Sequence, residues 1–341
     1  MTTSTTQFWG RSWKLTVQYP SGSGTATKEV VSQNYWEPEA LRVTFDVVKS
    51  TLPSPFWFAD ISIYNLNDPE IQNFLFNASW VTLEAGYQTG PNKSSIIWDG
   101  PVLQVLFDRV EVVDFKITLH CLASIPLINE NIVNFAQGPF ASQLQLVSRM
   151  VSKIGANYNA SPKAQTLLSA KQYPRGKTVF GKVSKYLFDM ADDNFLAHWM
   201  DGSKINISEM DSGASVPDLV YSPPDPPGYK AAQTNSSITK SVIGVPRQTP
   251  FGVIFTVLLD PRLIVKAPPL LVQLDRTVIS QSKIVYGSIQ TPLDADLVFV
   301  AAQIHHYGDT RGNDWHTEVT GYTRTYAQGL SQGMFLPNAQ R

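Results

Sequence analysis

Side chains that could support chemistry are concentrated in residues 305–318, which read HHYGDTRGNDWHTE. Six potential metal ligands or proton carriers lie in this segment: His305, His306, Asp309, Asp314, His316 and Glu318. A catalytic zinc ion needs about three converging protein ligands. Two strands joined by the central turn would bring His306 and His316 together, with Asp309 as a third ligand. The segment therefore suggests a metal-dependent hydrolase as one hypothesis.

The composition of the same segment is also typical of a turn between two strands, and we favour this interpretation. Gly308 and Gly312 supply unusual backbone dihedrals, and the side chain of Asp309 can cap a turn. Neighbouring residues in a regular strand point to opposite faces, so His305 and His306 cannot both join one site. We therefore predict no metal, no cofactor and no catalytic residue here, and keep the hydrolase as an alternative.

No other residues form an obvious active site. Cys121, the single cysteine, falls on the apolar side of a predicted strand, where a free cysteine behaves as a small hydrophobe. His120 and His198 have no nucleophile beside them in the sequence. Glycine-rich phosphate loops, GxSxG and HExxH are absent. These observations favour a protein that is not an enzyme.

Composition and charge narrow the class of protein further. Of the 341 residues, 43% are hydrophobic and only 16% are charged, which suits a surface that assembles with neighbours. The net charge of -1 offers no footprint for phosphate backbones, so nucleic acid is not the expected ligand. The start of the chain lacks the pattern of a signal peptide, and no apolar run is long enough for a membrane anchor.

Strand patterns dominate both ends of the chain. Apolar and polar residues alternate with a period of two in residues 12–19, 41–48 and 113–121, with turn sequences between them. Residues 1–125 are therefore predicted to form one β domain, a barrel or a sandwich. Residues 241–341 also read as strands, but their apolar runs are more continuous. Such runs predict strands with two buried faces, the outer one covered by another copy or a partner. The tail, residues 326–341, shows little pattern.

The middle of the chain follows a different period. Leu144, Val147, Val151 and Ile154 recur at helical spacing, and a second stripe contains Phe180, Val183, Leu187 and Met190. The segment 196–210 is typical of two short strands around Asp201-Gly202. We predict a small α/β module over residues 126–215. A proline-rich extended linker is predicted over residues 216–240. The expected fold is thus mainly β, with two β-barrel domains flanking an α/β module.

Aromatic side chains offer a second kind of site. Phe56, Trp57 and Phe58 follow a pair of prolines and are expected to be only partly buried in a single chain. Exposed rings more often fill the pockets of a protein partner than bind sugars. These three residues are therefore our interface candidates. A carbohydrate-binding module that uses the tryptophans remains an alternative.

Three parts of the chain resemble the tail or baseplate hub proteins of tailed phages, a family related to the trimeric base of type VI secretion spikes. The first part comprises LRVTFDVVKSTLPSPFWFADISIYNLN, VTLEAGYQ and IIWDGPVLQV. The second is the segment SVIGVPRQTPFGVIFTVLLDPRLIVKAPPLLVQLD. The third is LVFVAAQIHHYGDTRGNDWHTEVTGY, whose G-D-T-R-G-N-x-W-x-T-E pattern is the most specific.

The resemblance implies a structural protein of the virion tail, assembled in the cytoplasm of the bacterial host. Three copies would form a ring in which two β-barrels per subunit alternate, adapting a sixfold tail tube to a threefold spike. The implied partners are the tail spike protein, a tail tube or distal tube protein, and other baseplate proteins. DNA would be only a passing cargo in the channel. The family implies no catalytic residue.

Overall fold

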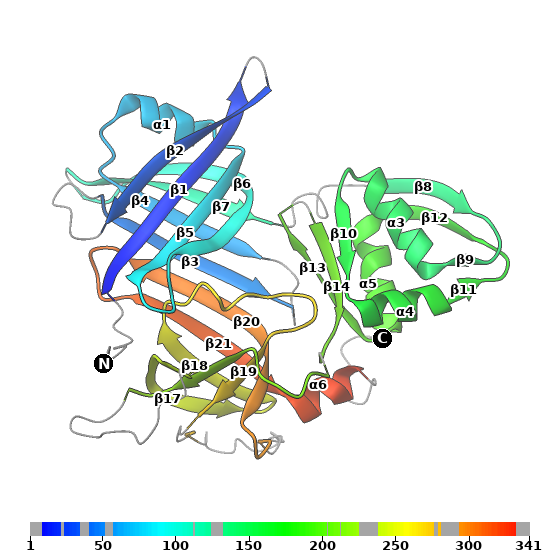
Figure 1. The fold of residues 1–341 in the computed structure, drawn as a ribbon. Helices are drawn as coiled ribbons and strands as arrows, with labels where there is room; N and C mark the ends of the chain where they lie inside the picture. The colour runs from blue at the N-terminus through cyan, green and yellow to red at the C-terminus, as the bar shows by residue number, and fades with distance from the viewer. Residues whose placement is uncertain are drawn as a thin grey trace.

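The computed structural model describes most of the chain. It covers residues 9–21, 24–34, 41–51, 57–111, 113–123, 132–202, 204–211, 213–224, 238–275, 279–280 and 293–331. We call residues 9–123 the N-terminal β region, residues 132–211 the α/β module and residues 213–331 the C-terminal β region. The two β regions form the long body at the left of Figure 1, and the module lies beside it. The predicted mainly β fold with an α/β insertion is confirmed.

The N-terminal β region is an antiparallel sheet with one short helix. Its strands are β1 (Trp9–Ser21), β2 (Gly24–Asn34), β3 (Val43–Ser50), β4 (Phe58–Tyr64), β5 (Trp80–Thr89), β6 (Ser95–Arg109) and β7 (Phe115–Leu122). Alternation places Trp13, Leu15 and Val17 in the core, as the period of two predicts. The helix, α1 (Pro69–Phe76), begins where the side chain of Asp68 accepts hydrogen bonds from two backbone N–H groups.

The α/β module has its own apolar core. It contains β8 (Ile132–Gln137), β9 (Ala141–Ser142), α3 (Gln143–Lys153), β10 (Asn157–Ala160), α4 (Pro162–Ala170), β11 (Gln172–Tyr173), β12 (Lys177–Lys182), α5 (Val183–Asp193), β13 (Leu196–Asp201) and β14 (Lys204–Glu209). The buried side chains of this core come from residues 133 to 207, from Val133 in β8 to Ile207 in β14. The predicted pair of strands around Asp201-Gly202 is confirmed, because Asp201 pairs with Lys204. Phe180, however, lies in β12 and is 70% exposed, so its place in the helical stripe is wrong.

The C-terminal β region completes the sheet. Its elements are β15 (Leu219–Ser222), β16 (Ile238–Lys240), β17 (Val242–Thr249), β18 (Gly252–Leu258), β19 (Leu271–Leu274), β20 (Val298–Asp309), β21 (Trp315–Thr323) and α6 (Arg324–Ser331). The predicted linker, residues 216–240, therefore carries strands at both ends, and β15 pairs with β16 in parallel. Residues 225–237 of it, and residues 281–292 of the region predicted to form strands, lie outside the described residues.

Strand β20 joins the two β regions into one sheet. It pairs with β21 and β19 on the C-terminal side and with β3 on the N-terminal side, from Gln303↔Ser50 to Asp309↔Thr44. One apolar core accordingly runs through both regions, from Trp13 to Val319. The two β regions therefore share a sheet and a core.

The continuous apolar run in β20 has an explanation inside the chain. Val298 and Val300 pack with Leu271 and with Ala327 of α6. Helix α6 therefore covers the start of β20 from within the chain. The expectation that another copy or a partner covers the outer face of the other C-terminal strands stays a prediction. The expectation of little pattern in the tail is wrong for its start, since residues 324–331 are helical.

No helix in the described part of the chain is long and apolar enough to cross a membrane.

Candidate functional site

The β20–β21 hairpin holds the cluster that the sequence singled out, but its register separates the two histidines. His306 pairs with Thr317, and Tyr307 pairs with His316. Paired residues share a face and consecutive residues alternate, so His306 and His316 point to opposite faces of the sheet. The expected convergence of these histidines across the hairpin is therefore wrong. Among the described residues, no group of three His, Cys, Asp or Glu side chains is placed to hold a metal.

His306 is a buried structural residue. Its side chain is 1% exposed, and its Nδ1 lies 2.8 Å from Thr317 Oγ1. Burial lowers the pKa of His306 to about 3, so the ring is neutral near pH 7. Thr317 Oγ1 also accepts a hydrogen bond of 3.0 Å from the backbone N–H of Asp260. His306 thus contributes to a hydrogen-bonded core.

Asp309 organises the hairpin turn together with arginines from the N-terminal β region. Arg42 donates to Asp309 Oδ2 over 2.8 Å, and the Arg311 N–H donates to Oδ1 over 2.9 Å. Burial raises the pKa of Asp309, but the hydrogen bonds from Arg42 and Arg311 outweigh it and leave this pKa below its usual value. Arg11 donates to the carbonyls of Asp309 and Gly312 over 2.8 and 2.6 Å. The sequence predicted the turn, and the structure adds the two arginines that hold it.

The turn end of this hairpin is closely packed. A Cβ atom on Gly308 would lie 2.5 Å from Phe45 Cζ and 2.7 Å from a ring atom of Trp315. Those two rings meet edge to face, with centroids 5.1 Å apart. The Trp315 indole N–H donates to the carbonyl of Gly86 over 3.2 Å. Gly308 is therefore required by packing between the two β regions.

A second connection between the β regions is a buried polar network around Asp260. Asp260 is completely buried and accepts hydrogen bonds from the Tyr221 hydroxyl and the Arg262 guanidinium, each at 2.6 Å. The same guanidinium donates to Asn92 and Thr239, each over 3.0 Å. Burial, and then the neighbouring carboxylate, raise the pKa of Tyr221 well above its usual value. Sequence reasoning missed this network, and the Asp-Pro-Arg segment at 260–262 was its only local signal.

The α/β module attaches to the body through tryptophans and one buried lysine. The rings of Trp57 and Trp199 stack with centroids 6.4 Å apart. The Lys49 ammonium lies 4.8 Å from the centroid of the Trp57 ring. Burial lowers the pKa of Lys49, and the carboxylates of Asp201 and Asp99 oppose that shift. The contact fixes the position of the β13–β14 turn on the body.

The structure places the three interface candidates differently. Phe56 lies outside the described residues. Trp57 is 1% exposed, so the expectation that it is partly exposed is wrong. Its indole N–H donates to the carbonyl of Ser50 over 3.0 Å, which makes it a core residue. Phe58 is 44% exposed and remains an interface candidate.

Five of the eight tryptophans, and the cysteine, lie in the core. Trp13, Trp57, Trp98, Trp199 and Trp315 are each about 1% exposed, which leaves these rings no surface for a sugar. Cys121 is 3% exposed, as expected for a small buried hydrophobe, and burial raises the pKa of its thiol.

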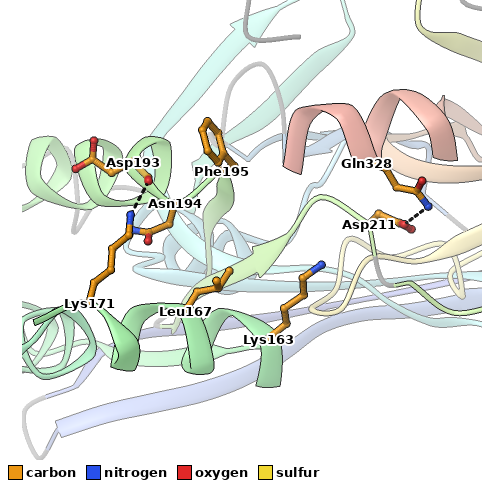
Figure 2. A pocket seen from close by; sticks show the side chains of 8 residues that line it. All are labelled: Lys163, Leu167, Lys171, Asp193, Asn194, Phe195, Asp211 and Gln328. Atoms are coloured by element: carbon orange, nitrogen blue, oxygen red, sulfur yellow. Dashed lines mark hydrogen bonds between the residues drawn. The ribbon is translucent and has the colours of Figure 1, made fainter. Parts of the chain in front are cut away.

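A hollow of about 380 Å³ separates the module from α6 (Figure 2). It is lined by Lys163, Leu167, Lys171, Asp193, Asn194, Phe195, Asp211 and Gln328. Lys171 Nζ donates to the Asp193 carbonyl over 2.9 Å, and Gln328 donates to Asp211 over 3.0 Å. Its polar groups therefore tie neighbouring elements together, and no nucleophile and base pair lies among its lining residues.

No family model and no curated protein matches the sequence. Solved structures do match. The tail protein from Neisseria meningitidis MC58 is 11% identical and superposes with a TM-score of 0.54, over 96% of this chain and 100% of that one. The chain has the fold of a phage tail protein. The 43 kDa tail protein of prophage MuSo2 from Shewanella oneidensis is 8% identical, with a TM-score of 0.53 over 93% of this chain and 99% of that one.

The same fold extends beyond phage tails. A chain of the half-lidded PdpA-VgrG complex of Francisella superposes with a TM-score of 0.51 at 8% identity. The match covers 92% of this chain and 58% of that one, so the Francisella chain is considerably longer. The tail-protein fold thus includes both β regions and the module of the present chain.

Proposed function

We propose that this protein is the structural hub of a phage tail baseplate. In this proposal three copies form a ring that adapts the sixfold tail tube to the threefold spike, and DNA passes through the central channel. The observation that carries the proposal is the shared fold, which covers nearly the whole of this chain and of two tail proteins. Two β regions in each of three copies would present six β regions to the tube.

The contacts between the β regions support an adapter role. An adapter must hold its two β regions at a fixed relative position, because both would contact the end of the same tail tube. The β3–β20 pairing, the Arg42–Asp309 ion pair and the Asp260 network all join the N-terminal to the C-terminal β region. The strand pairing and the Asp260 network are buried, where they resist displacement more than surface contacts do, and the Arg42–Asp309 pair adds a contact at the surface.

The chemistry of the hairpin favours a structural protein over a hydrolase. His306 and Asp309 are engaged in hydrogen bonds that stabilise the fold, and His316 lies on the other face of the sheet. The implied neighbours are a spike protein, a tube or distal tube protein and other baseplate proteins. Phe58 is proposed as a contact to one of them, because its ring is partly exposed at the start of β4.

The mass of the purified protein in solution tests the proposal. Light scattering after size exclusion is expected to give about three times 37.8 kDa for the protein alone, or that mass plus the mass of the spike when a co-expressed spike protein is bound. Negative-stain images of that species should show a ring with a central channel. A monomer under every condition, with or without candidate spikes, would overturn the proposal.

A further inference from the structure

The α/β module carries a concentration of positive charge that the net charge of -1 conceals. Eight of the 27 Lys and Arg residues, and none of the 28 Asp and Glu residues, lie in residues 132–188. The side chain of each is exposed, and the eight are Arg149, Lys153, Lys163, Lys171, Arg175, Lys177, Lys182 and Lys185. A segment as basic as this one attracts anionic partners.

Two connections at the far end of this module form a projection, which we call the distal tip. It comprises residues 138–140, which join β8 to β9, and residues 174–177, which join β11 to β12 and include its first residue. Figure 1 shows both connections on the side of the module that faces away from the β body. A Cβ atom on Gly176 would lie 2.5 Å from the Gln137 carbonyl oxygen, so the two connections are in direct contact. The tip is therefore a compact projection.

Phe140 is the large apolar residue of the tip, and its side chain is 70% exposed. Its φ of +61° lies in the left-handed region, which aromatic residues rarely adopt. The Phe140 N–H donates to the Tyr173 carbonyl over 2.8 Å, which fixes this conformation. A glycine or an asparagine would fit the same backbone with less strain, so the fold of the turn does not explain an exposed ring here.

Three of the eight cations lie around Phe140. Arg175 is in the tip itself, and Lys177 pairs with Gln137 across the β8–β12 ribbon. The Arg149 guanidinium donates to the amide oxygen of Gln137 over 2.7 Å. That acceptor is uncharged, so it holds Arg149 beside the tip without neutralising it. The tip thus combines one protruding ring with three positive charges.

This combination is typical of proteins that bind the surface of an anionic membrane. The cations are attracted to lipid phosphates, and the ring enters the boundary between headgroups and acyl chains, which needs no matched pocket. Single-stranded nucleic acid is bound along a basic groove with several stacking rings, whereas the tip is a projection with one exposed ring. An acidic protein would need a cavity shaped to receive Phe140. The membrane surface is the partner that fits both features of the tip.

We infer that the distal tip binds peripherally to a membrane that contains anionic lipids. Arg149, Arg175 and Lys177 contact the lipid phosphates, and the ring of Phe140 inserts between the headgroups. The attraction from cations farther away decays over about 10 Å at an ionic strength of about 0.1 M, so the residues of the tip dominate binding. This inference goes beyond the proposed hub, and it requires neither the ring nor the spike.

Sedimentation of the full chain with lipid vesicles tests the inference. The protein should bind vesicles of phosphatidylglycerol mixed with phosphatidylcholine, and it should not bind vesicles of phosphatidylcholine alone. Arg175→Gln/Lys177→Gln should weaken binding about thirtyfold, because each cation near an anionic surface contributes roughly fivefold. The matched control is Lys153→Gln/Lys163→Gln, which removes the same charge from exposed positions away from the tip. It should weaken binding less than about threefold.

A second pair of variants tests the ring. Phe140→Asn removes the ring and suits the left-handed backbone, so this variant should fold and bind the mixed vesicles about tenfold more weakly. Phe180→Asn is its control, because Phe180 is also 70% exposed but lies three residues beyond Lys177, about 10 Å along β12. The control should bind as the wild type does. If Phe140→Asn fails to fold, the charge variant and its control still decide the result.

Two other anionic probes identify the partner. Oligothymidylate and polyglutamate, at the same concentration of negative charge, should bind more weakly than the mixed vesicles. Binding of either probe as tightly as the vesicles would overturn the inference in favour of a nucleic acid or an acidic protein. Failure to bind the mixed vesicles would also overturn it, as would equal losses in a tip variant and its control. The mass measurement tests the hub separately, since a trimer can form whether or not vesicles are bound.

Discussion

The ion pair between Arg262 and Asp260 should be far more important for stability than a surface pair of the same length. Arg262→Met removes the guanidinium and leaves a fully buried carboxylate with the Tyr221 hydroxyl and the backbone N–H of residue 262 as its donors. Breaking a buried pair costs about 3–5 kcal/mol, and the remaining donors reduce the expected loss to about 2–4 kcal/mol. That corresponds to a factor of roughly 30 to 700 in the unfolding equilibrium.

The control is Lys266→Met, because the Lys266–Asp218 pair has the same 2.6 Å separation. Arg262 is as exposed as Lys266, at 36% against 34%, but Asp260 is 0% exposed whereas Asp218 is 37% exposed. Loss of the Lys266–Asp218 pair should therefore cost no more than about 1 kcal/mol. Urea unfolding, followed by the fluorescence of the buried tryptophans at one fixed protein concentration, gives both values. The explanation of the Asp260 network would be refuted if Arg262→Met costs no more than Lys266→Met.

Three further predictions follow from burial at single residues. Because the pKa of His306 falls from about 6.5 to about 3 on folding, acid should destabilise the protein in that range, by up to about 1.4 kcal/mol per pH unit from this residue. No such contribution exists above pH 6.5, and His306→Gln should flatten the acid limb of a stability profile; an unchanged slope would contradict the burial argument. Gly308→Ala should cost about 1–3 kcal/mol through overpacking, whereas Gly138→Ala, with open space around it, should cost less than about 0.5 kcal/mol in the same thermal unfolding assay. Similar costs for the two glycines would contradict the packing argument. The Cys121 thiol should react with a thiol reagent only after denaturation, and rapid labelling of the folded protein would show that it is accessible.

Local patterns determined much of this fold, and the sequence was informative where one face of an element is buried. The stripe of Leu144, Val147 and Val151 gave α3, and Trp13, Leu15 and Val17 gave the core face of β1. Helices α1 and α6 have only 8 residues each, so a helical period has little length in which to show, and contacts with the sheet stabilise them. Tertiary contact decided these elements.

The site was harder to predict than the fold, because register decides which side chains meet. A shift of one residue in the β20–β21 pairing would have put His306 opposite His316, and the sequence alone does not fix that shift. The buried Asp260 network was also hard to predict, because it depends on which strands meet in the folded sheet. Asp260 and Arg262 are neighbours in sequence, but Asn92 lies 170 residues from Arg262, and only the folded sheet brings it into contact.

The position of β20 makes the two β regions interdependent. Its residues 303–308 are paired on both sides, with β3 and with β21, so separating the β regions would expose the backbone groups and apolar side chains of the central strand. Gly308 and Trp315 add a packed contact at one end of that strand, and the Asp260 network adds a polar contact across the same boundary. A chain that had to present two β regions to a neighbour at a fixed angle would need such a shared strand, because a flexible linker could not transmit position from one region to the other.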